Sequence, residues 1–297
     1  MKRFFALSRT AHGVLDIAAP GFYALLWLGD FPQWQIILLS LFTAFAAYTA
    51  IYALNDLVGI AVDREKFAGG INAGYSVESS HLRYPLAQNV LSYRSGWIWF
   101  AAWFAMALVS SYLLNPTIVF ILIAATILEV IYCLLLKVTY LRTFVSGLVK
   151  SSGPIAAIFV VDQHPSPALL LLLLAWVFFW EIGGQNTPAD WNDTVEDQRV
   201  NAKTIPLQLG TQKAGIIVLI TLGLTVVISM FLPITSPLKL GIPYMLASLV
   251  AGFALLLIPG YQLYRTQEGR QAAALFDKAS YYPLAQLLII SIFVIFA

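Results

Sequence analysis

The stretch from residue 117 to residue 136 reads TIVFILIAATILEVIYCLLL, and Glu129 is its single charged side chain. A helix needs roughly 20 apolar residues to cross the hydrocarbon core of a bilayer, so this stretch predicts a membrane-spanning helix. Comparable windows recur along the 297-residue chain. The full set of windows is 14–29, 35–55, 95–114, 117–136, 143–161, 167–187, 213–232, 243–263 and 279–297. The sequence therefore predicts an all-α fold, in which residues 1–297 form a single transmembrane domain of nine helices.

The composition excludes several other classes of protein. Hydrophobic residues make up 60% of the chain and charged residues 11%, whereas a soluble domain is about 45–50% apolar and about 25% charged. Cys133 is the only cysteine, so an internal disulfide is excluded. The net charge of +2 argues against a nucleic-acid partner. The composition therefore predicts a protein that is surrounded by membrane lipid.

The positive charges predict an orientation. With nine spans, 16 of the 17 Lys and Arg residues fall on one side of the membrane, and Lys239 alone falls on the other. Cytoplasmic segments carry such an excess, so the N-terminus is expected in the cytoplasm. The two long inner connections, 58–94 and 189–212, are then cytoplasmic loops expected to cap the active site. No targeting peptide is recognised, which favours a prokaryotic plasma membrane.

An acidic cluster ends the sixth predicted span. Asp190, Asp193 and Asp197 have the spacing i, i+3, i+7, which places them on one helix face, and Asn186 joins that face one turn earlier. Carboxylates gathered in this way repel one another unless a cation lies among them. Mg²⁺ is usually bound by one or two carboxylates together with substrate phosphates, so this cluster predicts a magnesium site.

A second cluster ends the second span. Asn55 and Asp56 are followed by Asp63 at i+7 from Asp56. Asp56 and Asp190 are 134 residues apart, and so are Asp63 and Asp197. This equal separation suggests an internal duplication of one acidic motif. A solvated charged loop at the membrane surface is the alternative interpretation. The matched spacing of the two clusters favours a site for metal and phosphate.

These motifs resemble those of the UbiA superfamily of intramembrane prenyltransferases. The family's first motif is usually NDxxDxxxD and its second DxxDxxxD. The segments Arg83-Tyr84-Pro85-Leu86 and Asp197-Gln198-Arg199, followed by Lys203-Thr204-Ile205-Pro206, resemble its RPL and GDR…KTLPV stretches. The resemblance implies nine helices around a cavity that opens toward lipid, where Mg²⁺ on the aspartates binds an allylic prenyl diphosphate.

One position departs from the family pattern. Gly59 stands where the first motif normally has its middle aspartate. Metal held from that side would then rest on Asn55, Asp56 and Asp63. The departure leaves the number of Mg²⁺ ions open, and the complete second motif favours retained activity.

Cleavage of an allylic diphosphate leaves negative charge on the departing group, which metal ions and basic side chains stabilise. Arg suits bidentate phosphate contacts and Lys a point contact. The inner-side cations expected to bind the diphosphate are Arg64, Arg83, Lys137, Arg142, Arg199 and Lys203. The alternative for each is a topology signal or a lipid-headgroup contact.

Two further groups of residues are candidates for the cavity wall. Tyr48, Tyr52, Tyr132 and Tyr140 lie near the inner halves of spans two and four, where aromatic faces could attract a carbocation. Asp16, Glu129 and Glu181 lie inside spans, where ionisable groups are costly and are functional candidates by default. Ordinary packing is the alternative for both groups.

Three functions remain open. The leading one is Mg²⁺-dependent prenyl transfer to an acceptor, expected to be an aromatic quinone precursor or another lipid precursor. The second is a membrane terpene cyclase, in which the allylic cation closes on its own double bonds. The third is a transport or lipid-binding protein, which the position of the acidic clusters at the inner helix ends disfavours.

Overall fold

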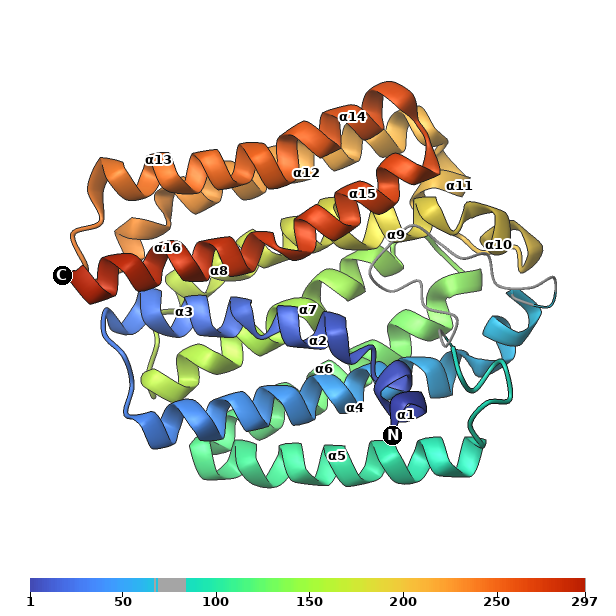
Figure 1. Ribbon diagram of the computed structural model, residues 1–297, viewed down its shortest axis with the longest axis horizontal. Helices are drawn as coiled ribbons and strands as arrows, with labels where there is room; N and C mark the ends of the chain where they lie inside the picture. Colours follow the sequence, from blue (N-terminus) through green and yellow to red (C-terminus); the bar gives the residue numbers. More distant parts are fainter. Residues whose placement is uncertain (67, 69–83, 297) are drawn as a thin grey trace.

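A computed structural model describes residues 1–66, 68 and 84–296, and all of the regular structure in these residues is helical (Figure 1). The elements in chain order are α1 (Lys2–Leu7), α2 (Thr10–Asp16), α3 (Ala18–Leu28), α4 (Trp34–Lys66), α5 (Tyr93–Leu114), α6 (Pro116–Leu134), η1 (Leu135–Lys137), α7 (Arg142–Val161), α8 (Pro167–Trp180), η2 (Glu181–Asn186), α9 (Thr187–Asn192), α10 (Thr194–Arg199), α11 (Ile205–Leu209), α12 (Thr211–Phe231), η3 (Leu232–Thr235), α13 (Gly241–Gly252), η4 (Phe253–Leu257), α14 (Ile258–Thr266), α15 (Gly269–Ser280) and α16 (Tyr282–Phe296).

Within the described residues, 9 helical stretches are long and apolar enough to cross a membrane. They are Thr10–Leu28, Trp34–Lys66, Tyr93–Leu114, Pro116–Lys137, Arg142–Val161, Pro167–Asn192, Thr211–Thr235, Gly241–Thr266 and Gly269–Phe296. The prediction of an all-α membrane fold with nine spans is confirmed.

The first span is broken rather than continuous. Helices α2 and α3 meet at Ile17, and Pro20 follows three residues later. Proline has no N–H to donate to the carbonyl of residue i−4, which here is that of Asp16. The break lies beside a buried Asp16, at 4% exposure, and gives this side chain a place in the interior.

Two inner segments are more helical than hydropathy predicted. Helix α4 runs for 33 residues to Lys66, so the connection expected at 58–94 begins well after residue 58 and ends at Tyr93. The residues between the hydropathy windows 243–263 and 279–297 form most of α15. Its buried apolar face explains this, because Ala272, Leu275, Phe276 and Ala279 all pack inward.

The sixth span changes its helical turn midway. The π-helical η2 lies between α8 and α9 and precedes Pro188, which cannot complete a regular turn. Gly183 allows η2 to approach α12 closely, because a Cβ there would lie 2.2 Å from Thr221 Oγ1. The wide turn allows Glu181, Gln185 and Asn186 to line the same cavity.

The helices are arranged in layers along the bundle (Figure 1). Helices α12, α13 and α14 lie along one side, α4 and α5 lie along the opposite side, and α3, α7 and α16 lie between them. The end of α4 at Lys66 and the short helices α9, α10 and α11 gather at one end of the bundle, to the right in Figure 1. Both aspartate motifs therefore lie at this end.

Candidate active site

The first motif meets a basic residue from the N-terminal segment. Arg9 Nη2 lies 3.2 Å from Asn55 Oδ1 and 3.3 Å from Asp56 Oδ1. Asp56 is buried, and Arg9 lies between α1 and α2 with φ 44°, in the left-handed region that residues other than glycine seldom adopt. The guanidinium of Arg9 thus reaches Asn55 and Asp56 within α4.

Asn55 is held from a second side by α6. Its Nδ2 donates to Glu129 Oε1 at 2.5 Å. Because Arg9 binds the amide oxygen and Glu129 the amide nitrogen, the orientation of the Asn55 side chain is fixed. Glu129, which hydropathy marked as an unusual charge inside a span, thus orients the first motif.

The second motif does not lie on one continuous helix. Asp193 is the joint between α9 and α10, with φ −94° and ψ 13°. The neighbouring Asn192 amide donates to Asp193 Oδ1 at 3.1 Å, and such local bonds compete with helical continuation. The prediction that the three aspartates share one face of a continuous helix is wrong, because α9 ends before Asp193 and α10 begins after it. The aspartates contact different cations as a result.

Buried cations hold the second motif. Arg142 of α7 lies 2.5 Å from Asp190 Oδ1. Lys66, at the end of α4, lies 2.6 Å from Asp197 Oδ1 and 3.7 Å from Asp193 Oδ2. Lys66 belongs to the same helix as Asn55 and Asp56, so this contact ties the end of the first motif to the second. Burial raises the pKa of the Asp197 carboxyl, and the Lys66 ammonium opposes that shift.

Three oxygens of the site suit a hard cation. Asp190 Oδ2, Asp197 Oδ2 and Asn186 Oδ1 are buried and have no hydrogen-bond partner in the described part of the chain. Unpaired buried oxygens are costly, and Mg²⁺ takes oxygen ligands, several of them from water or phosphate. Within the described part of the chain, no three His, Cys, Asp or Glu side chains lie close enough together to hold a metal ion by themselves. The donor set therefore fits Mg²⁺ when a ligand supplies further oxygens.

A cavity of about 540 Å³ extends from these motifs into the bundle. Asn55, Glu129 and Asn186 line its polar end. The remainder reaches Phe31, in the connection between the first two spans, and Val161, at the end of the fifth span. Most of the surface between is apolar. This shape suits a molecule with a polar head and a long apolar chain.

The family assignment follows from comparison with known proteins. The model of the UbiA prenyltransferase family matches residues 17–288. The chain belongs to the UbiA prenyltransferase family. Membership identifies it as a prenyltransferase and confirms the predicted resemblance to this family. Among curated protein sequences, none matches the chain significantly.

Solved structures of UbiA homologues share this fold. The apo UbiA homologue of Aeropyrum pernix K1 has a TM-score of 0.74 at 19% identity, over 97% of this chain and 98% of that one. A homologue from Archaeoglobus fulgidus bound to DMAPP and Mg²⁺ has a TM-score of 0.70 at 15% identity, over 98% and 99%. A structure described for digeranylgeranylglyceryl phosphate synthase has a TM-score of 0.70 at 16% identity, over 100% and 99%.

The departure of this UbiA-family chain at Gly59 has a structural counterpart. A Cβ at position 59 would lie 3.1 Å from Asp63 Oδ2. The half-buried Asp63 carboxylate thus approaches the space where the first motif of the family carries its middle aspartate. A carboxylate at position 59 would add a like charge directly beside Asp63.

The predicted diphosphate-binding cations fall into two groups. Arg142 is buried among the aspartates. The exposed Arg64 donates to Asn89 Oδ1 at 3.0 Å, and the exposed Lys137 lies 2.8 Å from Glu65. Arg199 Nη1 donates to the Lys66 carbonyl at 3.1 Å.

Two further predicted cations complete the set. The Lys203 backbone N–H donates to the Leu136 carbonyl at 2.7 Å, which places residue 203 next to η1. Arg83 lies outside the described residues. Thus Arg142 alone among the described predictions is buried within the site.

Three further basic residues, Arg9, Lys66 and Lys150, contact acidic side chains in the structure. In the sequence they belong to the 16 Lys and Arg residues that indicate the orientation, and nothing in that pattern marks them individually. Lys150 instead lies within the fifth span and contacts Asp16. A lysine one turn after Ser146 and two turns after Arg142 on one helix face was the signal available in the sequence.

The expected aromatic wall is largely present. Tyr48, Tyr52 and Tyr132 line the cavity. Tyr132 also accepts a hydrogen bond from Asn186 Nδ2 at 2.9 Å. Tyr140 differs, because it packs against the main hydrophobic core.

Proposed function

We propose that this protein transfers a prenyl group, within the membrane, from an allylic prenyl diphosphate to a small aromatic acceptor of the quinone-precursor type. The observation that carries the proposal is the contact of Lys66 with Asp193 and Asp197. It joins the helix that carries the first motif to the second motif. Asn55 and Asn186, from the same two segments, line the polar end of an otherwise apolar cavity. The diphosphate would lie at the polar end, and the prenyl chain would extend along the apolar body.

The aspartate motifs would hold Mg²⁺. The proposed ligands are Asn55, Asp56, Asp63, Asp190, Asp193 and Asp197. When bound, Mg²⁺ stabilises the negative charge that develops on a departing diphosphate. The homologue described with DMAPP and Mg²⁺ supports this assignment, as do the unpaired oxygens of Asp190, Asp197 and Asn186.

The buried cations have two roles in this proposal. Arg9, Lys66 and Arg142 neutralise the carboxylates before substrate binds, which limits the cost of burying them. A bound diphosphate is itself negatively charged, so the same side chains can also donate hydrogen bonds to its phosphate oxygens. Arg64, Arg83, Lys137, Arg199 and Lys203 are proposed to attract the diphosphate at the mouth of the site.

The cavity wall would protect the reaction from water. Its apolar body offers few groups that bind water. The rings of Tyr48, Tyr52 and Tyr132 lie on this wall, and aromatic faces attract cations. An allylic cation formed beside them would be stabilised until the acceptor reacts.

The orientation of the protein is part of the proposal. The excess of Lys and Arg at the end of the bundle that carries the motifs supports a cytoplasmic active site and N-terminus. The connections within 58–94 and 189–212 would then cap the site from the cytoplasm. We place the protein in a prokaryotic plasma membrane.

Product analysis tests the proposal. The purified protein would be incubated with Mg²⁺, with geranyl, farnesyl or geranylgeranyl diphosphate, and with a panel of phenolic acceptors. The expected product is a prenylated acceptor that forms only when both substrates and Mg²⁺ are present. A terpene hydrocarbon or alcohol formed equally well without acceptor would assign the protein to the cyclases instead. Failure to consume any donor would contradict the proposed activity.

A further inference from the structure

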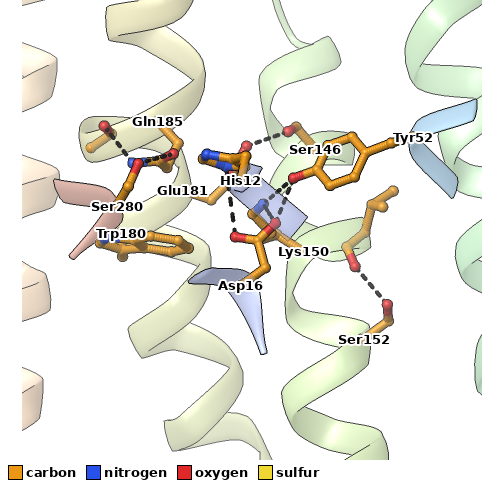
Figure 2. Close-up of polar contacts among 12 residues, drawn as sticks. His12, Asp16, Tyr52, Ser146, Lys150, Ser152, Trp180, Glu181, Gln185 and Ser280 are labelled. Carbon is orange, nitrogen blue, oxygen red and sulfur yellow. Dashed lines mark hydrogen bonds and ion pairs between the residues drawn. The ribbon is translucent and has the colours of Figure 1, made fainter. Parts of the chain in front are cut away.

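A second cluster of charged residues lies deeper in the bundle than the aspartate motifs. Glu181 opens η2 and precedes Asp190 by 9 residues, which is about 13 Å along a helix at its usual rise. Glu181, Lys150 and Tyr52 line the cavity at this depth (Figure 2). The cluster therefore faces the region just beyond the proposed diphosphate position.

The two oxygens of Glu181 differ in their surroundings. Oε1 accepts a hydrogen bond from Ser146 Oγ at 2.6 Å. Oε2 is buried and finds no hydrogen-bond donor in the described residues, although the side chain lines the cavity. Glu181 as a whole is 6% exposed. A buried carboxylate oxygen without a donor is costly. Because Glu181 lines the cavity, a rotation of its carboxylate would bring this oxygen to a ligand O–H group.

The other charges of the cluster are paired with one another. Lys150 Nζ lies 2.7 Å from Asp16 Oδ2 and 3.0 Å from the Tyr52 hydroxyl. The Tyr52 hydroxyl donates to the same Asp16 oxygen at 2.5 Å, and His12 Nε2 lies 3.6 Å from Asp16 Oδ1. Both oxygens of Asp16 thus have partners, whereas Glu181 Oε2 has no hydrogen-bond partner among the described residues (Figure 2).

Aromatic side chains lie near this cluster. Tyr52 and Phe276 line the cavity. Trp180 is buried behind the cavity wall, and its ring lies 5.9 Å from Lys150 Nζ. A flat aromatic ring fits between such walls. It also spans part of the distance from Glu181 to the diphosphate end.

We propose that Glu181 binds the hydroxyl group of a phenolic acceptor through Oε2 and takes up its proton during transfer. The inference rests on the proposed function, because it places the acceptor in the same cavity as the prenyl donor. Lys150 and Ser146 position the carboxylate. The acceptor ring lies between Glu181 and the allylic carbon.

In the proposed transfer, one C–O bond is replaced by one C–C bond, and two protons move. The bond between the allylic carbon and the diphosphate oxygen breaks, and its electron pair stays on the diphosphate. A ring carbon of the acceptor forms the new C–C bond while the hydroxyl proton moves to Glu181 Oε2. The ring carbon then releases its own proton to the diphosphate. Glu181 returns the first proton to the acceptor oxygen, which restores the phenol.

Calorimetric titration tests the inference with matched ligands. The probes are 1-naphthol, its methyl ether 1-methoxynaphthalene, and the saturated alcohol decahydro-1-naphthol. Each is titrated into purified protein that contains Mg²⁺ and the unreactive geranyl thiolodiphosphate. The variants are Glu181→Leu, Glu181→Gln, and Glu268→Gln as an exposed carboxylate control. Diphosphate release from geranyl diphosphate by the unmodified protein is measured separately and tests the proposed function alone.

We expect 1-naphthol to bind the unmodified protein and the Glu268→Gln control equally. Glu181→Leu should weaken its binding about tenfold or more, since a hydrogen bond to a charged group is lost. If Glu181→Leu does not fold, Glu181→Gln is used instead. Its amide oxygen still accepts a neutral hydrogen bond, so a smaller but measurable weakening is expected. The methyl ether should bind weakly to all variants.

Three results would overturn the inference. They are unchanged naphthol binding by the Glu181 variants, equal binding of the methyl ether, and equal binding of the saturated alcohol. If diphosphate release is normal and one of these results is found, the inference fails while the proposed function stands.

Discussion

Lys66 Nζ lies 2.6 Å from Asp197 Oδ1, and both side chains are almost fully buried. This lysine occupies a position among carboxylates where a metal ion would also be stabilised. It belongs to the first-motif helix and contacts the second motif, so it couples their positions. The chain thus neutralises part of its own aspartate cluster before any ligand arrives.

Replacement of this lysine is expected to increase the dependence on metal. Lys66→Met leaves Asp193 and Asp197 without their ammonium, and loss of one partner of a buried pair costs about 3–5 kcal/mol. Added Mg²⁺ should then raise the thermal midpoint of Lys66→Met more than that of the unmodified protein. Thermal unfolding in detergent across a magnesium series measures this. Lys137→Met, which removes an exposed partner of Glu65, is the control. Identical magnesium responses of Lys66→Met and the unmodified protein would contradict the role given to Lys66.

The buried pair of Arg142 and Asp190 should behave as a unit. Arg142→Gln alone is expected to lose about 3–5 kcal/mol of stability, because it leaves a buried carboxylate at 6% exposure without its cation. The double variant Arg142→Gln/Asp190→Asn should recover most of that loss. A double-mutant cycle of unfolding free energies gives the coupling. Additive effects of the two substitutions would mean that the pair has no energetic connection.

Restoring the aspartate of the family motif at position 59 is expected to change both the stability of the protein and its magnesium requirement. Gly59→Asp places a carboxylate beside Asp63, whose Oδ2 would lie 3.1 Å from the new Cβ. Stability without metal should fall, and the Mg²⁺ concentration for half-maximal diphosphate release should also fall. Gly59→Ala is the matched control, because it adds the same Cβ without the charge. Equal magnesium requirements of the two variants would show that position 59 does not contact the metal site.

Close packing of the sixth span should depend on Gly183. A Cβ at this position would lie 2.2 Å from Thr221 Oγ1 and 3.1 Å from the Val218 carbonyl. Gly183→Ala is therefore expected to destabilise the protein by about 1–3 kcal/mol through overpacking. At Gly223 on α12 a Cβ meets nothing within 4 Å, so Gly223→Ala should be neutral or stabilising by up to about 1 kcal/mol. Thermal midpoints of the two variants compare these effects, and an equal response would rule out the close contact.

The spans and the motifs were predictable for different physical reasons. A run such as residues 117–136 predicts a span because hydrocarbon requires about 20 apolar residues. The aspartates stood out because four acidic residues lie within eight positions of an apolar chain, at 190–197. Both signals are local in the sequence. Helix α15 was missed because its apolar face alternates with charges, which lowers its hydropathy without preventing burial.

The partners of the aspartates could not be predicted in the same way. Arg9 reaches Asp56 across 47 positions, and Lys66 reaches Asp197 from another helix. Lys and Arg residues near span ends indicate the side of the membrane. That pattern does not distinguish the residues that face solvent from those that contact buried carboxylates. Lys150 shows the same limit, since its contact with Asp16 depends on the break that Pro20 creates between α2 and α3.

The central claim is that the joined aspartate motifs activate an allylic diphosphate, and diphosphate release measures this most directly. The assay uses purified protein with geranyl diphosphate and a phenolic acceptor, with and without Mg²⁺. Asp193→Asn is compared with Asp30→Asn, an exposed aspartate near the opposite end of the cavity from the motifs. We expect release that requires Mg²⁺, is normal in Asp30→Asn, and falls at least about a hundredfold in Asp193→Asn. Release that continues unchanged in Asp193→Asn or without Mg²⁺ would contradict the account.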